Sequence, residues 1–216
     1  MTKPMDEIKG RVAAVVVTYN RAEMLRQCLM SLQKQTMPCD ILVVDNASTD
    51  DTQALVQRAA QHDASIFYRN TGENLGGAGG FNFGMRWAVE AGYAFVWVMD
   101  DDCFPEPVAL EKLLDADRLL QGEYGWLSSV ALWTDGRECR MNRPKIKKNF
   151  YDRIELLRDG ILLAEQATFV SLFLKAETIH AVGLPVKEFF IWGDDIEYTR
   201  RITIREKMPC YVVGQS

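Results

Sequence analysis

The sequence predicts an α/β protein built on a doubly wound, mostly parallel sheet. Short apolar runs typical of buried strands alternate with segments whose apolar residues recur at helical spacing. Polar residues follow three of these runs, where the strands end. Such alternation is characteristic of parallel sheets with helices on both faces, which bind ligands at the carboxyl ends of their strands. With 216 residues, 48% of them hydrophobic, the chain can form one large domain or two closely associated halves.

The elements follow from this pattern in order. We expect strands at 12–17, 41–44, 66–69 and 93–99, and helices at 23–33, 51–61 and 83–91, the second capped by Ser48 or Thr49. A further helix begins near Pro105 and Pro107. Residues 121–149 show little periodicity and predict a long, partly mobile loop, followed by a strand at 167–175 and a short helix at 176–182. Asp194 and Asp195 are expected to begin a last helix.

Composition excludes several classes of protein. A formal net charge of −5 gives no support for nucleic-acid binding, and no apolar run approaches the roughly 20 residues of a membrane span. Residues 1–9 are too polar for a signal peptide, so we expect a cytoplasmic protein. The basic stretch within 140–148 predicts either a solvated loop or a surface that approaches anionic lipid or a lipid-linked diphosphate, with peripheral contact on the cytoplasmic membrane face. Five scattered cysteines without a Cys-x-x-Cys pair predict free thiols.

Three adjacent carboxylates, Asp100, Asp101 and Asp102, follow the apolar run 93–99. Like charges this close repel one another, so a divalent cation shared with an anionic ligand explains the arrangement. Carboxylate oxygens suit Mg²⁺ or Mn²⁺, which commonly bridge to phosphates. The alternative is a solvated acidic loop that caps the next helix. Cys103 beside the acids is interpreted as a packed side chain rather than a soft metal ligand.

Other strand ends carry groups suited to a nucleotide. Asp45 can accept from a base N–H, and Thr18 or Asn20 can bond the other polar edge of a pyrimidine. Asx turns and helix caps use the same residues and are the alternative. The glycine block 76–80 matches neither the dinucleotide nor the P-loop template, which leaves a flexible loop or a close backbone approach to a diphosphate or sugar.

The segment 189–201 combines aromatic residues with two acids. Capping accounts for one acid, since the helix dipole favours negative charge at its N-terminus. A carboxylate in an aromatic setting is also a plausible general base, because burial raises its pKa, and Trp192 could stack on a sugar ring.

Five segments together resemble family 2 glycosyltransferases, whose fold is called GT-A. They are Val-Val-Val-Thr-Tyr-Asn-Arg at 15–21, Val-Val-Asp-Asn-Ala-Ser-Thr-Asp at 43–50, Asn-Leu-Gly-Gly-Ala-Gly-Gly-Phe at 74–81, Met-Asp-Asp-Asp at 99–102 and Trp-Gly-Asp-Asp-Ile-Glu-Tyr at 192–198. The glycine block and the Trp-Gly-Asp-Asp form are most similar to the galactofuranosyl- and rhamnosyltransferase branch. The resemblance implies a nucleotide-sugar-binding half at 1–124 and an acceptor-binding half that carries the base at 125–216.

The resemblance also implies an activity and its residues. It implies inverting, metal-dependent transfer of a sugar from a UDP- or dTDP-sugar to a hydroxyl of a glycan or polyprenyl-linked saccharide, with Mg²⁺ or Mn²⁺ as cofactor. Asp100 and Asp102 would be the metal ligands, and Asp195, with Asp194 next to it, the catalytic base. Donor binding would involve Thr18, Asn20, Arg21, Asp45, Asn74, Gly77, Asp100 and Asp101.

One departure from the family and two rival functions remain. Family members often supply a metal-binding His after the base-bearing helix, and this chain reaches Ser216 without one, so we expect a chain trimmed at its C-terminus. A sugar-nucleotide nucleotidyltransferase should have a glycine-rich, basic loop where Thr18-Tyr19-Asn20-Arg21 stands, which counts against it. In a non-catalytic nucleotide- or carbohydrate-binding module, Asp195 would have no chemical task.

Overall fold

The computed structural model describes residues 12–216, so residues 1–9, with the signal-peptide prediction, lie outside the described part. Its first half alternates strands and helices as expected. The elements are β1 (Val12–Thr18), α2 (Ala22–Leu32), β2 (Asp40–Asp45), α3 (Thr52–His62), β3 (Ile66–Asn70), α4 (Gly76–Glu90), β4 (Phe95–Asp100) and α5 (Ala109–Leu119).

The second half is less regular. It contains β5 (Leu127–Ser129), η1 (Arg140–Asn142), β6 (Lys145–Ile146), η2 (Phe150–Asp159), β7 (Ile161–Gln166), β8 (Leu172–Lys175), α6 (Ala176–Val182), η3 (Lys187–Phe189), α7 (Asp194–Arg200), the π-helical turn η4 (Arg201–Arg205) and β9 (Tyr211–Val213). The structure confirms the helix at 176–182 and the helix that begins at Asp194.

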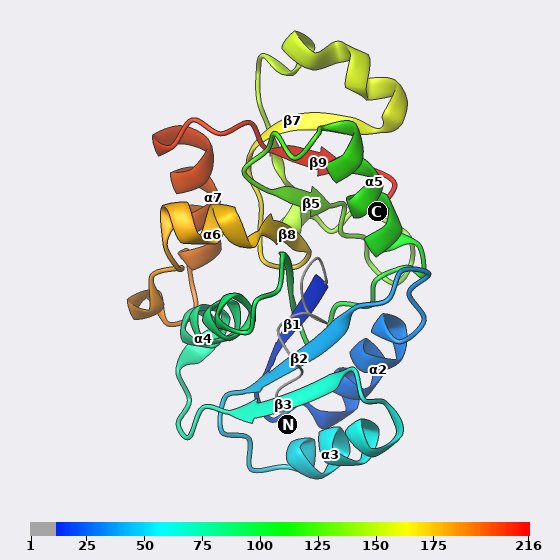
Figure 1. Cartoon of the computed structure of the whole chain (residues 1–216), viewed down its shortest axis with the longest axis vertical. Coiled ribbons are helices and arrows are strands. Elements are labelled where there is room, and N and C mark those ends of the chain that lie inside the picture. Colours follow the sequence, from blue (N-terminus) through cyan, green and yellow to red (C-terminus); the bar gives the residue numbers. More distant parts are fainter. Residues whose placement is uncertain (1–11) are drawn as a thin grey trace.

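All nine strands of the described chain form one sheet in the order β3-β2-β1-β4-β8-β5-β9-β7-β6 (Figure 1). The pairs β3–β2, β2–β1 and β1–β4 are parallel, which confirms the predicted core of the fold. Beyond β4 the sheet becomes mixed, because β8 pairs antiparallel with both β4 and β5. Strands from before and after residue 124 belong to the same sheet. The predicted division into a nucleotide-sugar-binding half and an acceptor-binding half stays a prediction.

Helices cover both faces of this sheet (Figure 1). One buried cluster joins α2, α3 and α5 to one face, and a second joins α4, α6 and α7 to the other. Strand β1 shows why both faces are apolar, since Ala14 and Val16 belong to the first cluster and Ala13, Val15 and Val17 to the second. Among residues 12–216, no helix is long and apolar enough to cross a membrane.

The glycine block is the main correction to the predicted elements. Helix α4 begins at Gly76 rather than near Phe83, so the flexible-loop interpretation of 76–80 was wrong. Close packing explains these glycines, because a Cβ at Gly80 would lie 2.5 Å from Cγ1 of Val17 and one at Gly84 would lie 2.3 Å from Cγ1 of Val15. The glycines let α4 lie directly on β1.

The region 121–149 is also more ordered than the sequence predicts. It contains β5, η1 and β6, while the expected strand at 167–175 shortens to β8. Strands β7 and β9 were not predicted. Each of these strands is two to six residues long, and their partners lie far away in sequence, so local periodicity gives little signal for them.

Candidate active site

The carboxyl ends of β1, β2 and β4 bring the predicted site residues together. Thr18 pairs in register with Asp45 of β2, and the neighbouring Val17 pairs with Asp100 of β4. This edge carries the loops after all three strands, which is the usual ligand position in a parallel α/β sheet.

The three aspartates of the triplet lie in different environments. Asp101 is buried, accepts a 2.7 Å hydrogen bond from the Thr18 hydroxyl and lies 3.2 Å from Nη1 of Arg21. Asp102 is exposed and accepts a 2.8 Å hydrogen bond from Nη2 of Arg21. Arg21 therefore bridges two of the three carboxylates. Thr18 and Asp101 join the β1 and β4 ends internally, so their proposed contacts with a donor remain predictions.

Asp100 and Asp102 form the cluster best suited to a metal ion. One potential ligand atom each from Asp100, Asp102 and Cys103 lie within 4.8 Å of one another. Burial, together with Asp102 and Asp101, raises the pKa of Asp100 to about 7. The negative charge of these clustered carboxylates is poorly balanced by nearby positive charge, so the cluster suits a hard divalent cation. Burial raises the pKa of the Cys103 thiol as well, which favours a protonated, packed side chain there.

Asp45 is fully buried and already has protein partners. Its carboxylate accepts hydrogen bonds of 2.6 Å from the Tyr68 hydroxyl and 2.8 Å from the backbone N–H of Ser48. Asn70 donates a longer bond of 3.4 Å to the same carboxylate. Tyr68 was not predicted as a site residue, although its strand β3 lies next to β2. Contact between Asp45 and a nucleotide base remains a prediction.

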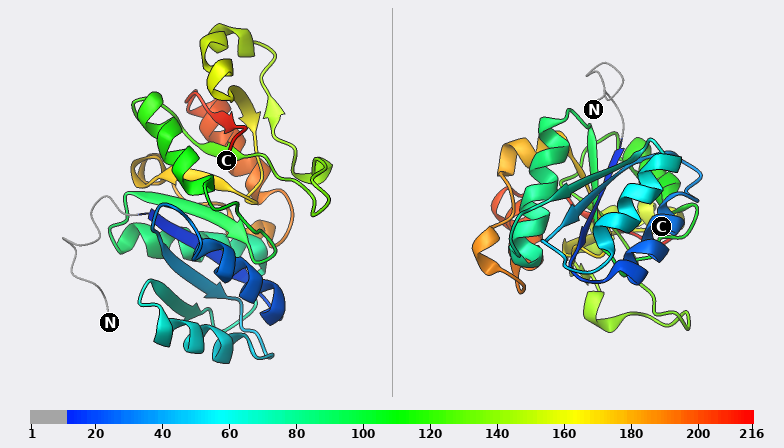
Figure 2. Two further views of the ribbon diagram at one scale, coloured as in Figure 1. Left: turned by 90° about the vertical axis from the view of Figure 1, so that its right-hand side faces the viewer. Right: turned by 90° about the horizontal axis from the view of Figure 1, so that it is seen from below.

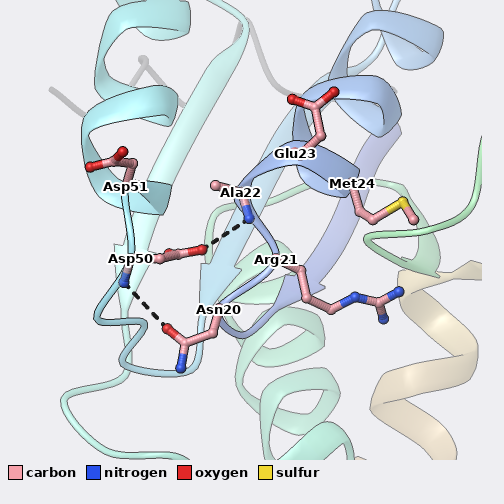
Figure 3. Close-up of a pocket in the computed structure, with 7 residues that line it drawn as sticks. All are labelled: Asn20, Arg21, Ala22, Glu23, Met24, Asp50 and Asp51. Atoms are coloured by element: carbon pink, nitrogen blue, oxygen red, sulfur yellow. Dashed lines mark hydrogen bonds between the residues drawn. The ribbon is translucent and has the colours of Figure 1, made fainter.

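Asn20 connects the loops that follow β1 and β2 (Figure 3). It adopts φ 53°, and its side-chain oxygen accepts from the backbone N–H groups of Thr49 at 2.7 Å and Asp50 at 3.3 Å. Asp50 accepts in turn from the backbone N–H of Ala22 at 3.1 Å. These bonds shape an open hollow of about 400 Å³ beside Arg21. These bonds hold the Asn20 side chain against the loop after β2, and its contact with a nucleotide remains a prediction.

Backbone N–H groups at the start of α4 donate hydrogen bonds to acceptors within the protein. The side-chain oxygen of Asn74 accepts from Gly76 at 2.9 Å, and the carbonyl of Phe190 accepts from Ala78 at 3.0 Å. Asn74 therefore forms an Asx turn just before this helix, whose N-cap is Leu75. The predicted donor contacts of Asn74 and Gly77 remain predictions.

Asp194 and Asp195 occupy the first turn of α7, after Gly193 at φ 92°. Asp194 is 5% exposed, and burial followed by the charge of Asp195 raises its pKa to about 6. Asp195 is more exposed, accepts from the backbone N–H of Ile196 at 2.6 Å, and has a pKa raised chiefly by burial. The charge of Asp194 also raises the pKa of Asp100, so α7 and the β4 end interact electrostatically. Trp192, 81% exposed, precedes them.

Comparison with protein families supports the same interpretation. Residues 13–119 match the model of glycosyl transferase family 2. The chain is 32% identical over 208 residues to the galactofuranosyltransferase GlfT1 of Mycolicibacterium smegmatis, covering 92% of this chain and 67% of that protein. It is 38% identical over 199 residues to the undecaprenyl-phosphate mannosyltransferase of Micrococcus luteus, covering 88% and 77%.

Solved structures show the same fold. The mannosyltransferase PcManGT from Pyrobaculum calidifontis, in complex with GDP-Man and Mn²⁺, has a TM-score of 0.67 at 22% identity and covers 95% of this chain. S. aureus TarS 1-349 in complex with UDP has a TM-score of 0.69 at 17% identity over 95% of this chain.

The fold and the carboxylate-lined edge define a GT-A glycosyltransferase domain. The chain belongs to glycosyl transferase family 2. It spans 66% to 67% of the length of the GlfT1 relatives and 55% of the PcManGT chain.

Proposed function

We propose that the protein transfers a sugar from a nucleotide-diphosphate donor to an acceptor hydroxyl, with inversion at the anomeric carbon. The observation that carries this proposal is the cluster at the end of β4, where potential ligand atoms of Asp100, Asp102 and Cys103 lie within 4.8 Å of one another. A second carboxylate cluster, Asp194 and Asp195, lies in the first turn of α7. One cluster suits a cation with its diphosphate, and the other suits a proton acceptor.

The donor is the first partner in the proposed reaction. A UDP- or dTDP-sugar carrying galactofuranose or rhamnose is favoured, because the GlfT1 relatives are named galactofuranosyltransferases. PcManGT, solved with GDP-Man, supports a nucleotide-sugar donor of this class and makes GDP-mannose the main competitor to test. Asp100 and Asp102 would hold Mg²⁺ or Mn²⁺, which supplies positive charge that stabilises the departing diphosphate. Arg21, whose side chain is 45% exposed beside Asp102, can contact the same diphosphate.

The acceptor hydroxyl would be deprotonated by Asp195. A partly exposed carboxylate with a raised pKa can receive that proton while remaining open to a substrate. Asp194 is the second candidate base, because its pKa is raised to about 6 but it is less exposed to solvent than Asp195. A polyprenyl-linked saccharide is the favoured acceptor, since one relative is named an undecaprenyl-phosphate mannosyltransferase.

Peripheral membrane contact on the cytoplasmic face is part of this proposal. Five basic residues and no acidic residue lie within 139–149, although the chain has a net charge of −5. Large apolar side chains near this stretch are exposed, among them Met141 at 75% and Tyr151 at 67%. Basic residues next to exposed apolar groups suit an anionic lipid surface, where a lipid-linked acceptor would reside.

Thermal unfolding with nucleotides tests the donor and metal assignments. UDP, dTDP and GDP, free and as their sugar conjugates, are added with Mn²⁺ or with EDTA. We expect one nucleotide to raise the melting temperature more with Mn²⁺, since ligands that bind only the folded state stabilise it by mass action. Asp102→Ala should abolish the metal-dependent part of the shift. Equal shifts with Mn²⁺ and EDTA in the parent protein would contradict the role of Asp100 and Asp102.

A further inference from the structure

The connection between α6 and α7 is hydrogen-bonded to α4 on one side and to α7 and the turn that follows it on the other. We call residues 183–190 the bracket. On one side, Nδ2 of Asn82 in α4 donates a 2.7 Å bond to the carbonyl of Pro185, and the Ala78 N–H donates a 3.0 Å bond to the carbonyl of Phe190. On the other side, the hydroxyl of Tyr198 in α7 donates a 3.0 Å bond to the carbonyl of Gly183. Nη2 of Arg201 donates a 3.1 Å bond to the Leu184 carbonyl.

The contact at Gly76 permits no other residue type without movement. A Cβ at this position would lie 2.2 Å from the Phe190 carbonyl oxygen and 2.7 Å from Cδ2 of its ring. Gly76 also adopts φ 69°, which L residues with side chains rarely adopt. Phe190 itself has φ 63° and ψ −63°, an unfavourable backbone conformation for a phenylalanine that persists only where its contacts hold it.

These contacts connect the two carboxylate clusters through the scaffold. Helix α4 is fixed on β1 by the close approaches of Gly80 and Gly84, and β1 pairs directly with β4, which ends at Asp100. The bracket ends at Phe190, where it contacts α4, and Asp195 follows five residues later in the chain. Figure 2 shows the segment around 190 on the side of the molecule where β1 ends and α2 begins.

We propose that the bracket sets the position of Asp195 relative to the metal-binding end of β4, and that Gly76 is the positioning residue at which it is fixed. This inference rests on the proposed role of Asp195 as base. Its physical basis is that a side chain at Gly76 must displace the Phe190 backbone, and the displacement passes to Asp195 through a short chain segment. Displacing this segment should impair the chemical step more than it weakens donor binding.

The chain offers a matched control for the test. Gly72 has φ 82°, and a Cβ at this position would meet no atom within 4 Å, so Gly72→Ala introduces similar backbone strain without a collision. The variants Gly76→Ala, Gly72→Ala and Asp195→Asn are compared with the parent. Hydrogen exchange of peptides spanning 183–197, calorimetric binding of UDP with Mn²⁺, and steady-state transfer with the donor and acceptor selected by screening are measured.

We expect Gly76→Ala to increase exchange in 183–197 and to lower kcat at least tenfold, with a clearly smaller fold-loss of nucleotide affinity. Some loss of affinity is expected because Gly76 adjoins the predicted donor contacts Asn74 and Gly77. Gly72→Ala should match the parent in exchange at 183–197. Unchanged exchange in Gly76→Ala, or equal losses of kcat and nucleotide affinity, would overturn the positioning role. If Gly76→Ala does not fold, Asn82→Leu, which removes the bond to Pro185, is held to the same criteria. Parental turnover by Asp195→Asn would instead overturn the proposed base.

Discussion

Asp101 and Asp102 are neighbours in sequence but differ in what they can bind. Asp101 is 2% exposed and is held by Thr18 and Arg21, so its oxygens serve the contact between β1 and β4. Asp102 is exposed, and its cationic partner Arg21 has a side chain that is 45% exposed. Asp101 therefore has a structural role because it is buried, whereas Asp102 is open to ligands because it is exposed.

The first residue-scale prediction separates chemistry from binding. Asp195→Asn should lower kcat by roughly 10² or more with donor affinity changed by only a few fold, because a general base acts on the acceptor in the transition state. Asp45→Ala should chiefly weaken nucleotide binding. Loss of its carboxylate also removes the acceptor for the Tyr68 hydroxyl and for the backbone N–H of Ser48, at a cost of about 1–3 kcal/mol in folding stability. Transfer rates and nucleotide titration measure both effects.

A parental rate for Asp195→Asn would make Asp195 a helix cap, and Asp194→Asn would then be the next variant to assay.

The second prediction concerns pH. The pKa of Asp100 is raised to about 7, so the folded, metal-free protein holds a proton that the unfolded chain releases near pH 4. Stability in EDTA should therefore fall as the pH rises from about 4 to about 7. Asp194, with a pKa raised to about 6, acts in the same direction. Asp100→Asn should reduce this fall, as measured by melting temperatures at pH 5 and pH 8.

Mn²⁺ binding should show the opposite trend, since the metal competes with the Asp100 proton. Mn²⁺ affinity that is equal at pH 6 and pH 8 would contradict the assignment of Asp100 as a ligand.

Helix α4 links a sequence motif to packing at the scale of elements. Its glycines lie at several points of contact, with β1 at Gly80 and Gly84 and with the bracket at Gly76. The motif resembles a phosphate-binding loop in composition, but here it forms a helix. Its glycines lack side chains, so β1 and the bracket can approach the helix closely.

The element-scale prediction compares two glycines of α4. Gly84→Ala should destabilise the fold by about 1–3 kcal/mol, because its Cβ would lie 2.3 Å from Val15 and 3.0 Å from Val44. Gly77→Ala, with its nearest atom at 4.0 Å, should be neutral or stabilise by about 0.4–1 kcal/mol through lost chain entropy. Urea unfolding of both variants provides the measurement. Equal stability of the two variants would show that α4 shifts away from β1 at little cost.

At the scale of the whole molecule, the basic stretch contains β6 at one edge of the sheet, whereas the acidic site lies at the end of β4, an inner strand. Figure 1 places β7 at the opposite end of the molecule from α3, and β6 pairs with β7. A charge distribution of this kind can orient the protein on an anionic surface, even though the net charge is −5.

Vesicle binding tests this orientation. A larger fraction of the parent protein should sediment with phosphatidylglycerol vesicles than with neutral phosphatidylcholine vesicles. High salt should lower the fraction bound to the phosphatidylglycerol vesicles. Arg140→Ala combined with Lys148→Ala should weaken binding about tenfold or more, at roughly 1 kcal/mol for each charge. Both side chains are exposed. The matched control combines Lys34→Ala with Arg58→Ala, which removes equal charge after α2 and on α3. Equal loss in both double variants would indicate net charge alone.

The sequence by itself determined the parallel core of the sheet, the helices from α2 to α7 in outline and the placement of the acidic triplet at a strand end. These features depend on local periodicity and on apolar runs long enough to be distinguished. The family motifs, spread from residue 15 to residue 198, also identified the class of protein.

Tertiary structure alone decided which polar residues are bound internally and which are open to a ligand. Thr18, Asn20 and Asn74 carry the predicted chemistry, yet the structure gives each of them a partner within the protein. The short strands β5, β7 and β9, and the contact between Gly76 and Phe190, depend on residues far apart in the chain. Such contacts form only when packing brings distant segments together, so no local pattern encodes them.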